Sequence, residues 1–274
     1  MTKTLQAIKW HGGKYYLANK IIQSMPLHIH YVEPYFGGGA VLLAKGAEGV
    51  SEVANDIHAE LTNFWSVLQD AALFEQFIRT ASAIPFSEAQ WNLSHRPTAD
   101  RVQAAVNFFV RGRKSRARQM RDFAPLSRTR TRRGMNEQAS AWLSAVEGLP
   151  EVHRRLKRVA VLNRDALEVI RTQDGKDTLF YLDPPYVHTT RTSPDIYQHE
   201  MSNDDHRRLL EVLANATGKF LLSGYRCDRY DEAAHRHGWH RCDFTVPNNA
   251  AGGKSQRQMT ESVWANCALP GSTE

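Results

Sequence analysis

The sequence has little cysteine and lacks any long apolar run. Its three cysteines among 274 residues, Cys227, Cys242 and Cys267, show no C-x-x-C spacing. A disulfide framework or a zinc site with cysteine ligands is therefore not expected, and we interpret the cysteines as reduced packing residues. The first ten residues have no apolar core of the kind found in secretory signals, and no stretch is long enough for a membrane-spanning helix. We expect a cytoplasmic protein with no membrane contact.

Clustered metal ligands are also missing from the sequence. The twelve histidines are scattered along the chain, and the cysteines lie far from one another. Metal-dependent nucleases and zinc deaminases need several such ligands close together, so both classes are disfavoured. We expect no metal site.

Positive charge is scarce outside one segment. The chain carries 35 Lys and Arg against 29 Asp and Glu, a formal net charge of +6. Residues 111–133 hold ten basic residues against Asp122 alone, so the rest of the chain is slightly acidic. The ten are Arg111, Arg113, Lys114, Arg116, Arg118, Arg121, Arg128, Arg130, Arg132 and Arg133. Such a segment predicts a nucleic-acid partner, because phosphate neutralisation releases counterions, and arginine suits bidentate contacts to phosphate and guanine.

Short apolar strands alternate with helical patterns over much of the chain. We expect strands at 31–33, 51–54, 158–162, 178–182, 220–223, 239–246 and 261–266, and helices at 40–45, 59–68, 87–110, 136–146, 204–215 and 230–237. This alternation predicts an α/β fold with a mostly parallel sheet and helices on both faces. No strand is expected in residues 73–146. The predicted organisation is a core of 1–72 and 147–274, interrupted by a helical insert, 73–146, that carries the basic segment 111–133.

The most informative local pattern is Asp183-Pro184-Pro185-Tyr186. It follows the apolar run 178–182 and so lies at the carboxyl end of a predicted parallel strand, where open α/β sheets build their sites. The two prolines stiffen the backbone and leave carbonyls without competing N–H groups. A carboxylate and a carbonyl can accept both hydrogens of an aromatic amine and aim its lone pair at a methyl donor. The ring of Tyr186 can stack on a base that has been flipped out of DNA.

Three motifs in order give the chain a family resemblance. Lys9-Trp10-His11-Gly12-Gly13-Lys14 is followed by Glu33-Pro34-Tyr35-Phe36-Gly37-Gly38-Gly39 and then by the D-P-P-Y motif. Over about residues 8–266 the chain resembles the DNA adenine methyltransferases of the Dam-like group. The resemblance implies a Rossmann-like core, S-adenosylmethionine as cofactor, and site-specific methyl transfer to N6 of a flipped-out adenine in double-stranded DNA. Tyr35 is a departure, since the family usually has Phe there.

The same resemblance implies roles for individual residues. Asp183, Pro184 and Tyr186 would be catalytic. The cofactor contacts would be Trp10, Lys14, Glu33, Gly37, Gly39, Asp56, Asp165 and Asp183. Asp56 would accept the ribose hydroxyls and Asp165 would lie near the cofactor adenine, although either could instead be a helix N-cap. The ten basic residues of segment 111–133, together with Lys254 and Arg257 in the loop 248–258, would contact DNA.

Two other functions remain open at this point: the same transfer to adenine in RNA, and a catalytically silent DNA-binding protein on the same fold. N4-cytosine and protein-glutamine transfer are disfavoured, because those enzymes generally carry Ser or Asn where Asp183 stands. We expect a monomer, since transfer to one strand needs no symmetry. The sequence leaves open the recognised DNA site and whether a restriction nuclease accompanies the enzyme.

Overall fold

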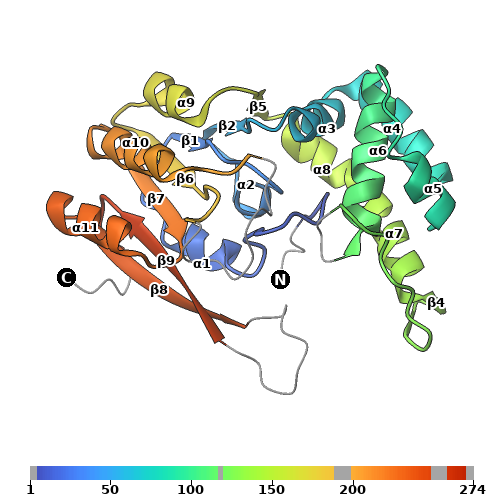
Figure 1. Cartoon of the computed structure of the whole chain (residues 1–274). Coiled ribbons are helices and arrows are strands. Elements are labelled where there is room, and N and C mark those ends of the chain that lie inside the picture. The colour runs from blue at the N-terminus through green and yellow to red at the C-terminus, as the bar shows by residue number, and fades with distance from the viewer. Residues whose placement is uncertain (1–4, 117–119, 188–198, 248–257, 270–274) are drawn as a thin grey trace. The chain divides into compact units, whose positions relative to one another are not determined.

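The computed structural model describes residues 5–116, 120–187, 199–247 and 258–269. The chain folds into two compact units, each assembled from segments that are distant in the sequence (Figure 1). The first unit comprises residues 1–15, 37–45 and 58–163, and the second comprises 16–36, 46–57 and 164–274. None of the helices in the described ranges combines the length and the apolar character that a membrane-spanning helix needs.

The second unit is built on a mostly parallel sheet. The part of the sheet in this unit has the strand order β2-β1-β6-β7-β9-β8. Neighbours among β2, β1, β6 and β7 pair in parallel, and β9 pairs antiparallel with both β7 and β8. The strands are β1 (His30–Glu33), β2 (Ser51–Asn55), β6 (Thr178–Leu182), β7 (Lys219–Gly224), β8 (His240–Pro247) and β9 (Gln258–Ala265). Every residue of β6 is buried, as expected of a parallel strand that is covered on both faces.

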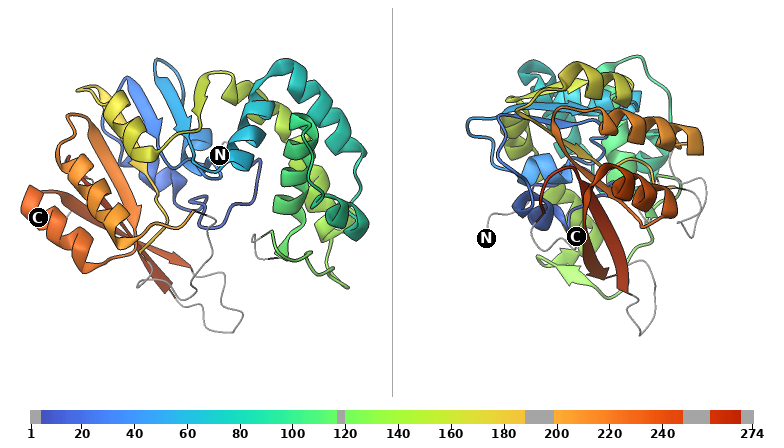
Figure 2. Two further views of the ribbon diagram at one scale, coloured as in Figure 1. Left: turned by 45° about the horizontal axis from the view of Figure 1, so that its top comes forward. Right: turned by 90° about the vertical axis from the view of Figure 1, so that its left-hand side faces the viewer.

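Helices cover this sheet on both sides. Figures 1 and 2 show α9, α10 and α11 side by side on one face and α1 on the other. Their bounds are α1 (Ala18–Gln23), α9 (Ala166–Gln173), α10 (Asn203–Ala214) and α11 (Asp228–His237). Local sequence fixes where they begin and end. Ser202 and Asp205 form a capping box at the start of α10, and α11 ends at Gly238, whose φ of 65° favours glycine.

The first unit is mainly helical. It contains α2 (Ala40–Ala44), α3 (Ala59–Gln69), α4 (Ala71–Ala83), α5 (Glu88–Leu93), α6 (Arg101–Lys114), α7 (Glu137–Glu147), α8 (Leu149–Leu156), β5 (Val159–Leu162) and the hairpin of β3 (Thr131–Arg132) and β4 (Met135–Asn136). Phe77 contacts Phe64 and Phe109, with ring centroids 6.0 and 5.7 Å apart, and Phe109 contacts Trp142 at 5.1 Å. These buried rings join α3, α4, α6 and α7 into one core.

The expected α/β class is confirmed, and every expected strand and helix except the helix at 87–110 is present with its bounds shifted by three residues or fewer. The helix expected at 87–110 is two helices, because the chain leaves α5 before Pro97 and begins α6 at the N-cap Asp100. Helices α1, α4 and α8 were not expected, whereas α9 begins directly after Asp165, as the alternative interpretation of that residue as an N-cap implies. The expectation of no strand in 73–146 is wrong, since β3 and β4 form a hairpin there. Its turn residues Arg133 and Gly134 have φ of 57° and 73°, the positive values that a tight two-residue hairpin turn requires.

Candidate active site

The carboxyl ends of three adjacent strands of the second unit carry acidic residues. Glu33 is the last residue of β1, Asp56 follows the last residue of β2, and Asp183 follows the last residue of β6. Because β1 pairs in parallel with both β2 and β6, these three positions lie at the same edge of the sheet. This edge is where ligands bind in open α/β sheets, so it is the candidate site.

The Asp183–Tyr186 corner is held in place by residues on both sides of it. Asp183 is half-buried, while Pro184 beside it is buried. Before the corner, the buried hydroxyl of Tyr181 is 3.1 Å from that of Ser223. Burial, followed by the charge of Asp183, raises the pKa of Tyr181 well above its usual value, so the phenol stays neutral.

Tyr186, the last residue of the corner, packs against one residue that follows β7 and one that lies in β9. Its ring is only 9% exposed. Its hydroxyl donates to Oε2 of Glu261 on β9 at 3.3 Å, and its ring meets that of Tyr225 at 4.6 Å between centroids with 69° between the planes. Neither Tyr225 nor Glu261 was singled out from the sequence. Tyr225 follows β7 and Glu261 lies within β9. Only the pairing of the strands shows that both residues contact Tyr186.

Asn55 organises the edge around Asp56. It is 0% exposed, and its Nδ2 donates to the carbonyls of Pro34 and Arg164, both at 3.0 Å. Its Oδ1 accepts the N–H of Arg164 at 2.9 Å, and its own carbonyl accepts the N–H of Phe36 at 2.8 Å. One amide therefore ties together the loop after β1, the end of β2 and the residue before Asp165. Sequence reasoning passed over Asn55, although it directly precedes Asp56.

Tyr35 is buried near the candidate site and is affected by the charges of three carboxylates. Burial and then the charges of Asp165, Asp205 and Asp56 raise the pKa of Tyr35 above its usual value. The carboxylates of Asp165 and Asp56 can accept hydrogen bonds from hydroxyls and favour positive charge on a ligand. Asp165 is exposed and caps α9, since its carboxylate accepts the N–H of Glu168 at 3.0 Å.

Asp56 and Glu33 differ in their surroundings. The N-cap of α3 is His58, so the alternative interpretation of Asp56 as a helix cap is wrong. Asp56 is half-buried beside Ile57, which is 48% exposed. Glu33 is only 2% exposed, and its Oε1 accepts a hydrogen bond from the hydroxyl of Tyr31 at 2.7 Å. The chain thus holds Glu33 inside the sheet and leaves Asp56 closer to solvent.

Trp10, Lys14, Gly37 and Gly39 belong to the first unit. A Cβ at Gly37, where φ is 51°, would lie 3.0 Å from Cδ1 of Trp10, and one at Gly38 would lie 2.7 Å from Cβ of Trp10. In this structure these glycines therefore make room for the indole. Lys14 is buried and donates to the carbonyl of Gly12 at 3.0 Å. The cofactor roles of the four residues remain predictions.

Three members of the basic segment support the fold of the first unit. Arg111 donates to the carbonyl of Ser94 at 2.6 Å and pairs with Glu60 at 2.8 Å, and Arg113 donates to the carbonyl of Ala7 at 2.8 Å. Lys114 is 0% exposed. Its Nζ donates to the carbonyl of Pro85 at 2.6 Å and lies 4.2 Å from the centroid of the Trp142 ring, and burial lowers its pKa to about 8.

The other described members of the segment are exposed, and four of them lie in or just before the hairpin. Exposed side chains are those of Arg116, Arg121, Arg128, Arg130, Arg132 and Arg133. The last two belong to the β3–β4 hairpin, which extends from the start of α7 (Figure 1). Arg133 pairs with Glu147 at 2.9 Å, and Arg130 lies 3.7 Å from Glu137. Arg118, Lys254 and Arg257 lie outside the described residues.

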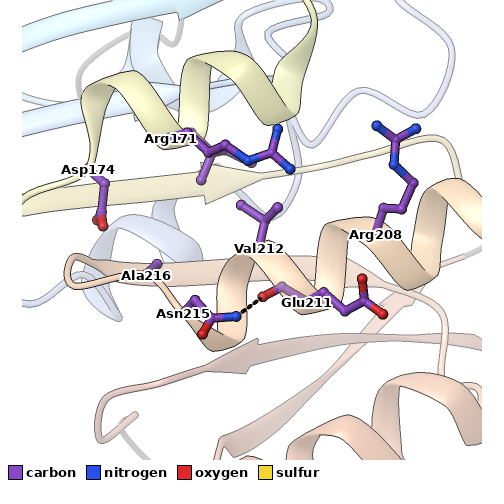
Figure 3. Close-up of a pocket in the computed structure, with 8 residues that line it drawn as sticks. Arg171, Asp174, Arg208, Glu211, Val212, Asn215 and Ala216 are labelled. Carbon is purple, nitrogen blue, oxygen red and sulfur yellow. Dashed lines mark hydrogen bonds between the residues drawn. The ribbon is translucent and has the colours of Figure 1, made fainter.

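A groove of about 430 Å³ lies between α9 and α10 of the second unit. Figure 3 shows Arg171 projecting from α9, and Arg208 and Glu211 from α10. Other lining residues include Asp174, which precedes β6, and Asn215, which precedes β7. The groove thus extends toward the starts of these strands, opposite the edge that carries Asp183, and it is not the candidate site.

Comparison with known proteins gives the family. The model of the family described as D12 class N6 adenine-specific DNA methyltransferase matches residues 10–245. The chain belongs to this family.

Individual relatives match over different shares of their length. A DNA N-6-adenine-methyltransferase of Escherichia phage P1 is 25% identical over 218 residues, covering 76% of this chain and 28% of the phage protein. The type II methyltransferase M.MjaIII of Methanocaldococcus jannaschii is 23% identical over 249 residues, covering 79% of this chain and 82% of the relative. A DNA adenine methylase of Vibrio cholerae is 36% identical over 69 residues, covering 25% of this chain and 24% of the relative. The chain thus spans about a quarter of the phage and Vibrio proteins that it matches. The family resemblance stated from the motifs is confirmed.

The first prediction concerns Asn55 of this D12 class methyltransferase. Asn55→Ala should lower the free energy of unfolding by about 3 kcal/mol, because it leaves the carbonyls of Pro34 and Arg164 and the N–H of Arg164 without their buried partner. Urea denaturation followed by circular dichroism measures the change. Asn215→Ala is the matched control, since its exposed amide makes one hydrogen bond, to the carbonyl of Glu211 at 2.7 Å. A loss for Asn55→Ala no larger than that of the control would mean that the amide does not hold these loops together.

Proposed function

We propose that this chain transfers a methyl group from S-adenosylmethionine to the N6 amine of adenine in double-stranded DNA, acting as a monomer. The observation that carries the proposal is the half-buried Asp183 beside the buried Pro184, at the carboxyl end of β6, in a member of this family. The family description and the names of the relatives support adenine as the target.

The residues at the site edge fit a nucleoside cofactor with a positive sulfonium. Asp56 and Asp165 provide carboxylates that can accept hydroxyl and amine hydrogens, and the electronegative surroundings of Tyr35 favour positive charge. We assign Asp56, Asp165, Glu33 and Asp183 to this role. The bound cofactor supplies an electrophilic methyl group.

The corner residues act on the target amine. The carboxylate of Asp183 and the carbonyl of Pro184 accept the two N6 hydrogens and turn the nitrogen lone pair toward the methyl donor. The negative charge of Asp183 stabilises the positive charge that develops on nitrogen during transfer. Tyr181 stays neutral beside Asp183, so it adds no second negative charge to the corner. The ring of Tyr186 stacks on the extruded base.

DNA binding is assigned to the first unit. We propose that residues 73–146 form the recognition region and that its exposed arginines around the β3–β4 hairpin contact phosphates. Lys114 is left out of this set, since its side chain is buried. The remainder of the chain, residues 1–72 and 147–274, would form the catalytic core that carries the Asp183–Tyr186 corner.

The test of the proposed function is an assay of methyl incorporation from labelled cofactor. Duplex DNA, single-stranded DNA and RNA are compared, and the modified nucleoside is identified by mass spectrometry. We expect N6-methyladenine, formed fastest in duplex DNA. Faster transfer to RNA would make adenine in RNA the substrate. No transfer to any of the three would favour the alternative of a catalytically silent DNA-binding protein.

Asp183→Ala should lower kcat in this assay by at least about 100-fold, because it removes an acceptor and the charge that act in the transition state. Binding to duplex DNA should be retained. Asp177→Ala is the matched control, since it removes an exposed carboxylate just before the other end of β6. Transfer by Asp183→Ala at a rate close to that of the control would show that the assigned chemistry is wrong.

The arginine assignment predicts a change in salt dependence. Replacing Arg128, Arg130 and Arg132 together by alanine should weaken duplex binding and reduce the slope of log K against log salt by about 0.9 for each phosphate that the protein no longer neutralises. Fluorescence anisotropy at several salt concentrations measures the slope. The control is Arg154→Ala with Lys157→Ala, which removes two exposed basic residues at α8 of the same unit. An unchanged slope in the triple variant would mean that these arginines do not face DNA.

A further inference from the structure

Tyr186 is the corner residue whose ring must be fixed if it is to receive a base. A tyrosine side chain has two rotatable torsions, so a solvent-exposed ring would sample several orientations. Here the ring is 9% exposed and contacts two residues to which no role has yet been assigned, Tyr225 and Glu261. Tyr225 directly follows β7 and Glu261 lies in β9, whereas Tyr186 lies in the corner after β6.

Strand register brings the three side chains together. In the antiparallel pair of β7 and β9, Gly224 lies opposite Ser262. Tyr225 directly follows Gly224, the last residue of β7, and Glu261 directly precedes Ser262 in β9, so each is the chain neighbour of one member of this pair. In the parallel pair of β6 and β7, Leu182 lies opposite Leu222, so the corner after β6 and Tyr225 after β7 follow neighbouring strands at the same edge of the sheet. The meeting of the three residues is therefore a consequence of the sheet.

The two contacts restrain different motions of the ring. The rings of Tyr186 and Tyr225 pack edge to face, with their centroids 4.6 Å apart. This contact opposes sideways movement of the Tyr186 ring. The hydrogen bond from the Tyr186 hydroxyl to Glu261 Oε2, at 3.3 Å, fixes the far end of the ring. Glu261 is half-buried within β9 and paired with Phe244 of β8, so the acceptor itself has a rigid support.

We infer that Glu261 is a positioning residue for methyl transfer: through its hydrogen bond to the Tyr186 hydroxyl, and with Tyr225 against the ring, it presents Tyr186 in the orientation that stacks on the target base. This inference rests on the proposed function. It extends the site beyond the D-P-P-Y corner to β7 and to the β8–β9 hairpin.

The experiment is a double-mutant cycle on the full chain. Glu261→Ala, Tyr186→Phe and the double variant are compared with wild type for kcat and for the KM of S-adenosylmethionine on duplex DNA. Each single variant should lower kcat about tenfold, as expected for the loss of one hydrogen bond in a desolvated site, with the KM for the cofactor unchanged. The double variant should be no slower than either single variant, because both remove the same bond.

Conservative and control variants separate positioning from general stability. Glu261→Gln keeps a carbonyl acceptor for the hydroxyl and should restore most of the rate that Glu261→Ala loses. Asp243→Ala is the matched control, since this carboxylate of the same hairpin accepts a hydrogen bond from Ser262 at 2.6 Å instead of from Tyr186. Its effect on kcat should add to that of Tyr186→Phe. If Glu261→Ala does not fold, Glu261→Gln and Tyr186→Phe still decide the matter: the first should be nearly as active as wild type and the second about tenfold slower.

If the wild-type protein is active, three results would overturn this inference and leave the proposed function standing. These are additive losses for Glu261→Ala and Tyr186→Phe, an unchanged kcat in Tyr186→Phe, or a Glu261→Gln variant as slow as Glu261→Ala. A wild-type protein that transfers no methyl group contradicts the proposed function itself, and this inference then falls with it.

Discussion

The buried amide of Asn55 is the interaction on which the candidate site depends most. Parallel strands place their carboxyl ends at one edge, but they do not fix the loops that follow them. Asn55 does so by accepting one backbone N–H and donating to two backbone carbonyls, in the loop after β1 and just before α9. Because every polar atom of this amide is paired inside the protein, the arrangement costs no unsatisfied buried group. Asp56 directly follows Asn55 in the chain, and Asp165 directly follows its partner Arg164.

The corner after β6 is rigid for a related reason. Two prolines limit its backbone, and the tyrosines on either side are anchored by hydrogen bonds to Ser223 and Glu261. The amine of adenine is a weak nucleophile, so the gain available to an enzyme comes from holding acceptors and base in place before transfer begins. A corner whose backbone carbonyls, flanking phenols and carboxylate are held in fixed positions suits that task.

The basic residues of segment 111–133 form two groups with different surroundings, which the net charge of the segment does not distinguish. Arg111, Arg113 and Lys114 complete the last turn of α6 and bond to backbone carbonyls of their own unit. The arginines around the β3–β4 hairpin are exposed instead. An isolated buried cation would be costly, and Lys114 is accommodated because a carbonyl and the face of Trp142 receive its ammonium.

Whether a feature could be predicted from the sequence depends on how far apart along the chain its interacting residues lie. The D-P-P-Y corner and the strand before it are encoded within nine consecutive residues, 178–186, and the structure has β6 at the expected bounds. Asn55 is separated from its partners Pro34 and Arg164 by 21 and 109 positions, and Tyr186 from Glu261 by 75. No local pattern indicates such pairs, because the strand order of the sheet creates them. The hairpin at β3–β4 was missed for another reason: its turn signal, Arg133-Gly134, lies at the end of a segment that was interpreted only for its charge.

The central claim is that Asp183 and Pro184 hold the amino group of an extruded adenine. The most direct measurement is a crystal structure of the chain with duplex DNA containing its target site and a non-reactive analogue of the methyl donor. The account predicts an adenine outside the helix, with its N6 within hydrogen-bond distance of the Asp183 carboxylate and the Pro184 carbonyl and its ring against Tyr186. An adenine whose N6 contacts other groups, or an analogue bound away from the edge that carries Asp56 and Asp183, would contradict it.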